Sequence, residues 1–184
     1  MSVVYLLAIG AVPAPVLDWA ETIVSEWCPW PVKRTPSLPF PEGSYDVQRG
    51  QYKSVEIMKA VAQNAPREAT RVLAVTEGDL AIPTLTFVFG QAQLDGRFAV
   101  VSLSRLRQEF YGLPPDEAIL RERLTKEVLH ELGHTFGLTH CSTPVCVMSL
   151  ATHIGLVDSK EQRYCGSCGA FLVRRFAASN GDAP

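Results

Sequence analysis

The sequence predicts a single-domain α/β fold with a mixed β-sheet in which two neighbouring strands are antiparallel. Short apolar runs that are typical of buried strands alternate with helical apolar patterns along the 184 residues. An Asp95-Gly96 pair separates two strand-like runs, which is the pattern of a β-hairpin. A chain of this length can bury one hydrophobic core without disulfides. We therefore expect one domain over 1–184, with an N-terminal α/β subdomain at 1–137, a C-terminal subdomain at 138–175 and a flexible tail at 176–184.

The first part of the chain should supply most of the sheet and two of its helices. Apolar spacing predicts a strand at 3–10, a helix at 15–27, at most a short strand at 32–35 within a Pro-rich loop, a helix at 49–65 and a strand at 72–75. The first run could be mistaken for the core of a signal peptide. No Lys or Arg precedes it, however, and it ends in Gly and Pro, so a buried strand is the better interpretation.

The middle of the chain should form a hairpin followed by a long helix. The β-rich runs at 84–93 and 97–103 are predicted to be antiparallel neighbours. Prolines and acidic residues at 114–117 suit the first turn of a helix. Apolar residues then repeat every four positions and should pack on the sheet: Leu120, Leu124, Val128 and Leu132.

That helix carries a pattern with the spacing of a catalytic zinc site. His130 and His134 lie four residues apart, so their imidazoles project from one helical face. Gly137 permits a left-handed turn that returns His140 as a third ligand. Three protein ligands leave a fourth zinc position for water, and Glu131 is placed to take a proton from that water.

Two close pairs of cysteines follow the histidines. They are Cys141 and Cys146, then Cys165 and Cys168. Four thiolates in such pairs indicate a closed structural zinc site. Disulfide bonding is the alternative, but the chain lacks convincing secretory features. Cys28 remains outside this pattern as a small buried residue.

The two motifs, joined by Met148, resemble those of the archaemetzincins, H-E-x-x-H-x-x-G-x-x-H-C-x4-C-x-M and then C-x-x-C. The resemblance covers His130 to Cys168 and is looser upstream. It implies a metzincin-like zincin fold with a twisted, mixed β-sheet that has one antiparallel edge strand, an active-site helix and a small zinc-stapled C-terminal lobe. It also implies a zinc metallopeptidase with Glu131 as general base and Met148 in a turn beneath the metal.

The same resemblance implies two zinc ions and a substrate-binding edge. The catalytic zinc would lie on His130, His134 and His140, and the structural zinc on the four cysteines that begin at Cys141. Residues 87–92 would be the antiparallel edge that pairs with an extended peptide.

Composition limits the partners and the cellular location that we expect for the protein. A net charge of −2 gives no reason to expect nucleic acid or an anionic membrane as partner. No apolar run approaches the roughly 20 residues that span a bilayer. Thiolate ligands suit a reducing compartment, so we expect a cytoplasmic monomer that acts on peptides or proteins. Asp158 and Lys160 are expected to form a surface salt bridge without chemical consequence.

Two other functions remain open at this point. A zinc-dependent endoribonuclease also uses H-x3-H-x5-H spacing, but that class has no glutamate after the first histidine, whereas Glu131 is present here. A non-catalytic or latent zinc protein that binds peptides or partners is the other alternative. Its ligands would be kept for structure alone.

Overall fold

A five-stranded sheet forms the centre of the computed structural model, which describes residues 2–179. From one edge to the other, its strands are β2 (Val32–Arg34), β1 (Val4–Ile9), β5 (Arg71–Thr76), β9 (Phe98–Ser102) and β8 (Gly90–Ala92). The first four strands are parallel, and β8 pairs antiparallel with β9. The predicted mixed sheet with an antiparallel edge strand is confirmed.

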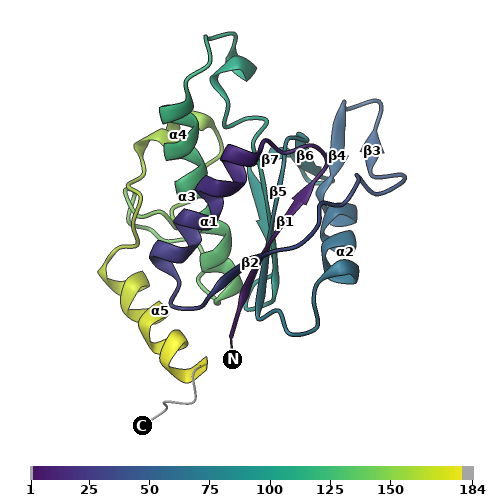
Figure 1. The fold of residues 1–184 in the computed structure, drawn as a ribbon. Coiled ribbons are helices and arrows are strands. Elements are labelled where there is room, and N and C mark those ends of the chain that lie inside the picture. Colours follow the sequence, from purple (N-terminus) through teal and green to yellow (C-terminus); the bar gives the residue numbers. More distant parts are fainter. Residues whose placement is uncertain (1, 180–184) are drawn as a thin grey trace.

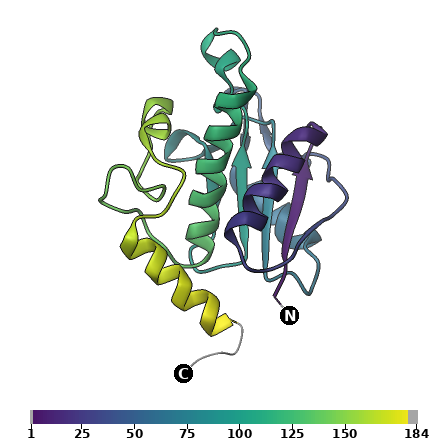
Figure 2. The same ribbon diagram turned by 60° about the vertical axis from the view of Figure 1, so that its left-hand side comes forward.

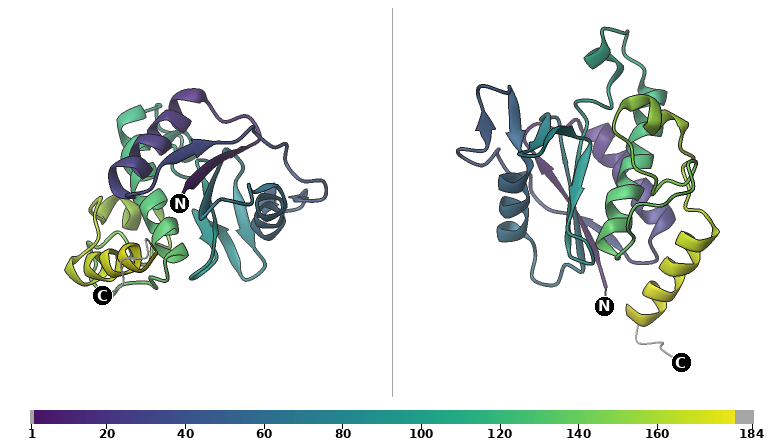
Figure 3. Two further views of the ribbon diagram at one scale, coloured as in Figure 1. Left: turned by 60° about the horizontal axis from the view of Figure 1, so that its bottom comes forward. Right: turned by 180° about the vertical axis from the view of Figure 1, so that it is seen from behind.

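Helices cover both faces of this sheet. Helices α1 (Ala14–Trp27) and α3 (Glu117–Thr135) lie on one face, and α2 (Ser54–Asn64) lies on the other (Figures 1 and 3). Side chains of β1 alternate between two apolar clusters: Leu6 packs with α1 and α3, while Leu7 packs with α2. This alternation follows from the two-residue period of a strand, so each buried strand must be apolar on both faces.

A smaller four-stranded sheet was not predicted. Its order is β3 (Tyr45–Asp46), β4 (Gln51–Lys53), β6 (Leu80–Ile82) and β7 (Leu85–Val88). The helix predicted at 49–65 was therefore wrong at its start, because residues 51–53 form β4. Tyr52 fits the helical apolar pattern but instead stacks on Phe40, with ring centroids 3.9 Å apart.

The run at 84–93 is divided between the two sheets. The predicted pairing of the whole run with 97–103 was wrong, because only β8 pairs with β9. Residues of β7 pair antiparallel with β6, which immediately precedes them in the chain. The first half of the run thus forms a short local hairpin with β6, and the chain crosses to the main sheet near Phe89.

The remaining elements are η1 (Gln108–Tyr111), α4 (Ile154–Ser159) and α5 (Gly166–Ser179). Helix α5 packs beside the end of α3 (Figure 2). There the Phe176 ring contacts the rings of Trp27 and Phe136. The tail predicted at 176–184 is helical as far as Ser179; residues 180–184 lie outside the described part. Within residues 2–179, no helix is long and apolar enough to cross a bilayer.

Candidate functional site

Helix α3 presents the histidine motif from a rigidly packed position. Asp116 caps the helix, and its carboxylate accepts a hydrogen bond from the Ile119 amide at 3.0 Å. The two prolines thus precede the helix and do not form its first turn. The predicted apolar stripe is buried against the sheet, in keeping with the expectation for Leu120, Leu124, Val128 and Leu132.

The three histidines of the motif converge. One ligand nitrogen from each of His130, His134 and His140 lies within 4.8 Å of the others. The Nε2 atoms of His130 and His134 are 3.1 Å apart. Zinc–nitrogen bonds of about 2.0–2.1 Å in tetrahedral geometry would separate two such atoms by roughly 3.3 Å. Gly137 adopts a φ of 98° at the end of the helix, as predicted, and this turn brings His140 to the other two. The set fits a zinc ion.

Backbone carbonyls orient two of these rings. The Nδ1 atom of His130 lies 2.8 Å from the Val147 carbonyl oxygen, and that of His134 lies 2.7 Å from the Leu138 carbonyl oxygen. Each Nδ1–H donates to its carbonyl, which leaves the Nε2 lone pair free for a metal. Burial lowers the pKa of all three histidines, that of His130 most strongly, so the neutral ligand form is favoured.

Glu131 lies at the same place, pressed against the edge strand. A Cβ atom added to Gly90 of β8 would lie 2.6 Å from both Cγ and Oε1 of Glu131, so only glycine leaves room for the carboxylate. Burial raises the pKa of Glu131 well above its usual range. Glu127 raises this pKa further and Lys160 lowers it.

A cleft of about 660 Å³ joins these groups to the edge strand. Its lining includes all three histidines, Glu131 and residues 85–92. The turn after β8 is attached to α3, since the Asp95 amide donates to the His134 carbonyl at 2.9 Å. The edge strand and the histidines therefore form one site.

Two charged residues of the cleft were not predicted. Glu127 and Lys160 both line it, with Lys160 Nζ 3.7 Å from Glu127 Oε1. The expected surface salt bridge between Asp158 and Lys160 was wrong, because Asp158 pairs with Arg123 and Lys160 is buried. The four-residue step from Glu127 to Glu131 placed Glu127 on the histidine-bearing side of the helix, and this was the available signal.

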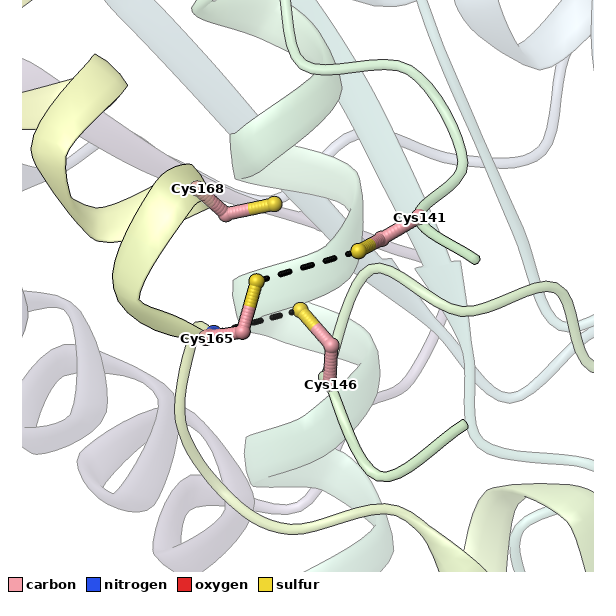
Figure 4. Close-up of side chains that lie close together, drawn as sticks. All are labelled: Cys141, Cys146, Cys165 and Cys168. Atoms are coloured by element: carbon pink, nitrogen blue, oxygen red, sulfur yellow. Dashed lines mark hydrogen bonds between the residues drawn. The ribbon is translucent and has the colours of Figure 1, made fainter. Parts of the chain in front are cut away.

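The four clustered cysteines also converge, as Figure 4 shows. Their sulfur atoms lie within 4.8 Å of one another, and those of Cys141 and Cys165 are 3.7 Å apart. Zinc–sulfur bonds of about 2.3 Å would give a tetrahedral edge of roughly 3.8 Å. A hydrogen bond from Ser167 lowers the pKa of Cys165 to about 6, which favours the thiolate. All the cysteines are free thiols, so the disulfide alternative was wrong, and Cys28 is buried elsewhere in the core.

Met148 lies beneath the histidine-bearing helix. It is fully buried, and a Cβ atom added to Gly133 would lie 2.5 Å from its sulfur. Because Gly133 precedes His134, this close contact supports the helix directly under a ligand. Tyr164 also supports α3 here, and its hydroxyl donates to the Leu129 carbonyl at 2.6 Å.

Comparisons with known proteins agree with this fold and site. The sequence profile described as "Peptidase family M54" matches residues 44–174. An archaemetzincin from Pyrococcus furiosus is 41% identical over 178 residues, covering 94% of this chain and 93% of the relative. An archaemetzincin from Methanocaldococcus jannaschii is 46% identical over 133 residues, covering 72% of each chain.

Solved structures give the same result. The crystal structure of archaemetzincin from Methanopyrus kandleri matches with a TM-score of 0.82 and 39% identity, covering 95% of this chain and 94% of that one. Archaemetzincin from Archaeoglobus fulgidus, complexed with malonate, matches with a TM-score of 0.80 and 29% identity, covering 92% and 99%.

The fold and the site, together with these relatives, define a zinc metallopeptidase. Within that class, the chain belongs to peptidase family M54, the archaemetzincins. Family membership removes the endoribonuclease alternative, because the family consists of peptidases.

Proposed function

We propose that this protein hydrolyses peptide bonds with a zinc ion on His130, His134 and His140 and with Glu131 as general base. The observation that supports this most strongly is the convergence of three ligand nitrogens within 4.8 Å in a cleft that also holds Glu131. A zinc ion there supplies a Lewis acid for the scissile carbonyl and lowers the pKa of water.

Glu131 moves the proton in this proposal. Its carboxylate takes a proton from the attacking water and then gives it to the nitrogen of the leaving amine. Glu131 is buried in the same cleft as the three histidines, so its carboxylate lies where such a proton transfer would take place. The contact with Gly90 restricts where the carboxylate can lie, which favours correct alignment.

The outer edge of β8 is proposed to bind the substrate. This strand is the last in its sheet, so among residues 2–179 no strand pairs with the outer side of Gly90–Ala92. An extended peptide can pair with those backbone groups regardless of its sequence, next to the histidines. Such pairing would position the scissile bond while the lining side chains select among peptides.

A second, structural zinc is proposed on Cys141, Cys146, Cys165 and Cys168. The sulfur separations match a tetrahedral site, and four thiolates leave no open position. The monomeric state, the absence of nucleic-acid and membrane partners, and the cytoplasmic location stay predictions.

The test compares zinc-loaded wild type with Glu131→Gln on a peptide library read by mass spectrometry. Glu42→Gln is the control, because Glu42 is exposed and does not line the cleft. Wild type and Glu42→Gln should cleave alike, while Glu131→Gln should lose about 10²–10⁴-fold of the rate and keep its zinc. Identical product profiles from wild type and Glu131→Gln would overturn the proposal for Glu131, and an absence of cleavage by zinc-loaded wild type would favour a latent or non-catalytic protein.

A further inference from the structure

Two buried charged atoms in the cleft have no hydrogen-bond partner. They are Lys160 Nζ and Glu127 Oε1, whose side chains are 1% and 3% exposed. Their 3.7 Å separation keeps them in Coulombic contact but is too long for a hydrogen bond. A buried donor and a buried acceptor left in this state are costly, so a group that bonds to both would be bound favourably.

Two neighbouring cations on α3, unlike Lys160, have hydrogen-bond partners. Lys126 Nζ bonds to Glu122 Oε1 at 2.6 Å and to the Asp158 carbonyl at 2.9 Å. Arg123 makes two hydrogen bonds to the Asp158 carboxylate. Those two cations do not line the cleft, whereas Lys160 does. The unmade hydrogen bonds thus lie in the wall of the cleft, and a ligand group would reach the two buried atoms by displacing the side chains that cover them.

The pair lies close to the proposed reacting centre. Glu127 precedes Glu131 by four residues on α3, which places it one helical turn, about 5.4 Å, along the same face. The rest of the cleft lining is largely apolar and includes Phe87, Phe89 and Leu150. A residue beside the scissile bond would therefore be the part of a bound peptide nearest to this pair, and in such surroundings its hydrogen bonds would be strong.

We propose that Glu127 and Lys160 form a specificity site for a primary carboxamide, the side chain of Gln or Asn beside the scissile bond. The carboxamide oxygen accepts from the Lys160 ammonium, and its NH₂ group donates to the Glu127 carboxylate. One neutral group therefore satisfies both unbonded atoms. This inference deepens the proposed peptidase function and rests on it.

Other side chains fit the pair less well. A carboxylate would bond to Lys160 but would face Glu127 at close range, and the pair has no net charge that would favour an ionised ligand. An aliphatic side chain would leave both atoms without partners. A site built to bond a polar group rejects an analogue that lacks the group.

The test uses matched peptides with Gln, Glu or Leu at each position flanking the scissile bond. Wild-type kcat/KM should favour Gln over both others by between about tenfold and about a hundredfold at one of the two positions. Dissociation constants for the same peptides on zinc-loaded Glu131→Gln should show the same order. This second readout needs no turnover.

Two variants test the assignment to this pair. Glu127→Gln removes the carboxylate that faces Lys160 Nζ, while Glu131 remains as a neighbouring acid, so the preference for Gln over Glu should fall. The double variant Glu127→Leu/Lys160→Met should favour Leu, and it avoids leaving a single buried charge that could unfold the chain. Glu122→Gln is the matched control on the same helix, outside the cleft, and should keep the wild-type preference.

The outcomes separate this inference from the proposed function. Failure of wild type to cleave any peptide would overturn the proposed function, and the dissociation constants would still decide the inference. Cleavage or binding without a preference for Gln would overturn the carboxamide site. A Gln preference that persists unchanged in Glu127→Gln and in the double variant would overturn it as well.

Discussion

The position of Glu131 depends on a neighbour that has no side chain. Gly90 lies in the edge strand, and any Cβ at this position would overlap the Glu131 side chain, at 2.6 Å from its nearest atoms. Real Cβ contacts are not this short, so a larger residue at position 90 must displace the carboxylate or the strand. The strand is hydrogen-bonded to β9, and the carboxylate is therefore the part that moves.

We predict that Gly90→Ala lowers the peptide-cleavage rate by about 10²-fold, because a shift of about 1 Å in a catalytic group has effects of that size. Zinc content and thermal unfolding should stay close to wild type. Gly169→Ala is the control, since a Cβ at Gly169 meets nothing within 4 Å. Wild-type kinetics in Gly90→Ala would contradict this account of Glu131.

The sequence predicts the positions of some side chains at the site better than those of others. Spacing within one helix and one turn determines where His130, His134 and Glu131 lie, so local rules sufficed. Lys160 lies thirty positions after His130, and its approach to Glu127 depends on how the segment after α4 folds back. No local pattern encodes that contact, and the polar character of Lys160 favoured a surface position.

Among the elements, α3 packs on the sheet with one face and presents the histidines to the cleft with the other. Leu120, Leu124, Val128 and Leu132 are buried on the sheet side, while the histidines line the cleft. The four-residue period made this face predictable from the sequence. Because the packed side fixes the helix, it also fixes the ligands that the helix carries.

Shortening one residue of this stripe should destabilise the whole chain. Leu124 is 0% exposed, and we predict that Leu124→Ala lowers the free energy of unfolding by about 2–5 kcal/mol. Leu113→Ala is the control, because Leu113 is 52% exposed. Urea unfolding measures both changes. Equal midpoints for the two variants would show that the stripe does not hold α3 in place.

Strand pairing was less predictable than helix packing. The run at 84–93 has strand propensity throughout, yet its first half pairs with β6 and its second half with β9. Propensity identifies a strand but does not name its partner, since pairing depends on contacts far apart in the sequence. The small sheet was missed for the same reason, because its strands are only two to four residues long.

For the whole molecule, the segment after Gly137 shares the main hydrophobic core. Cys146, Met148 and Leu172 belong to the same buried cluster as residues of the sheet and α1. This segment has little regular structure before α5. A metal on the four cysteines would therefore contribute to the stability of the entire fold.

We predict that Cys165→Ser lowers bound zinc from two ions to one per chain and reduces the melting temperature, because the structural metal is lost. Cys28→Ala is the control, because Cys28 lies in the hydrophobic core and is not one of the four clustered cysteines. This variant should keep two zinc ions. Metal analysis and calorimetry measure the two effects. Two zinc ions in Cys165→Ser would contradict a four-cysteine site.

The two proposed metal sites share a stretch of backbone, and this has a thermodynamic consequence. His140 is followed directly by Cys141, and the carbonyl that orients the His130 ring belongs to Val147, the neighbour of Cys146. Occupation of one site would thus pre-order residues of the other, so the two ions should bind with positive cooperativity. By thermodynamic linkage, each zinc ion should raise the affinity of the protein for the other by the same coupling free energy. The affinity of the peptidase centre for zinc would then depend on a metal that takes no part in hydrolysis.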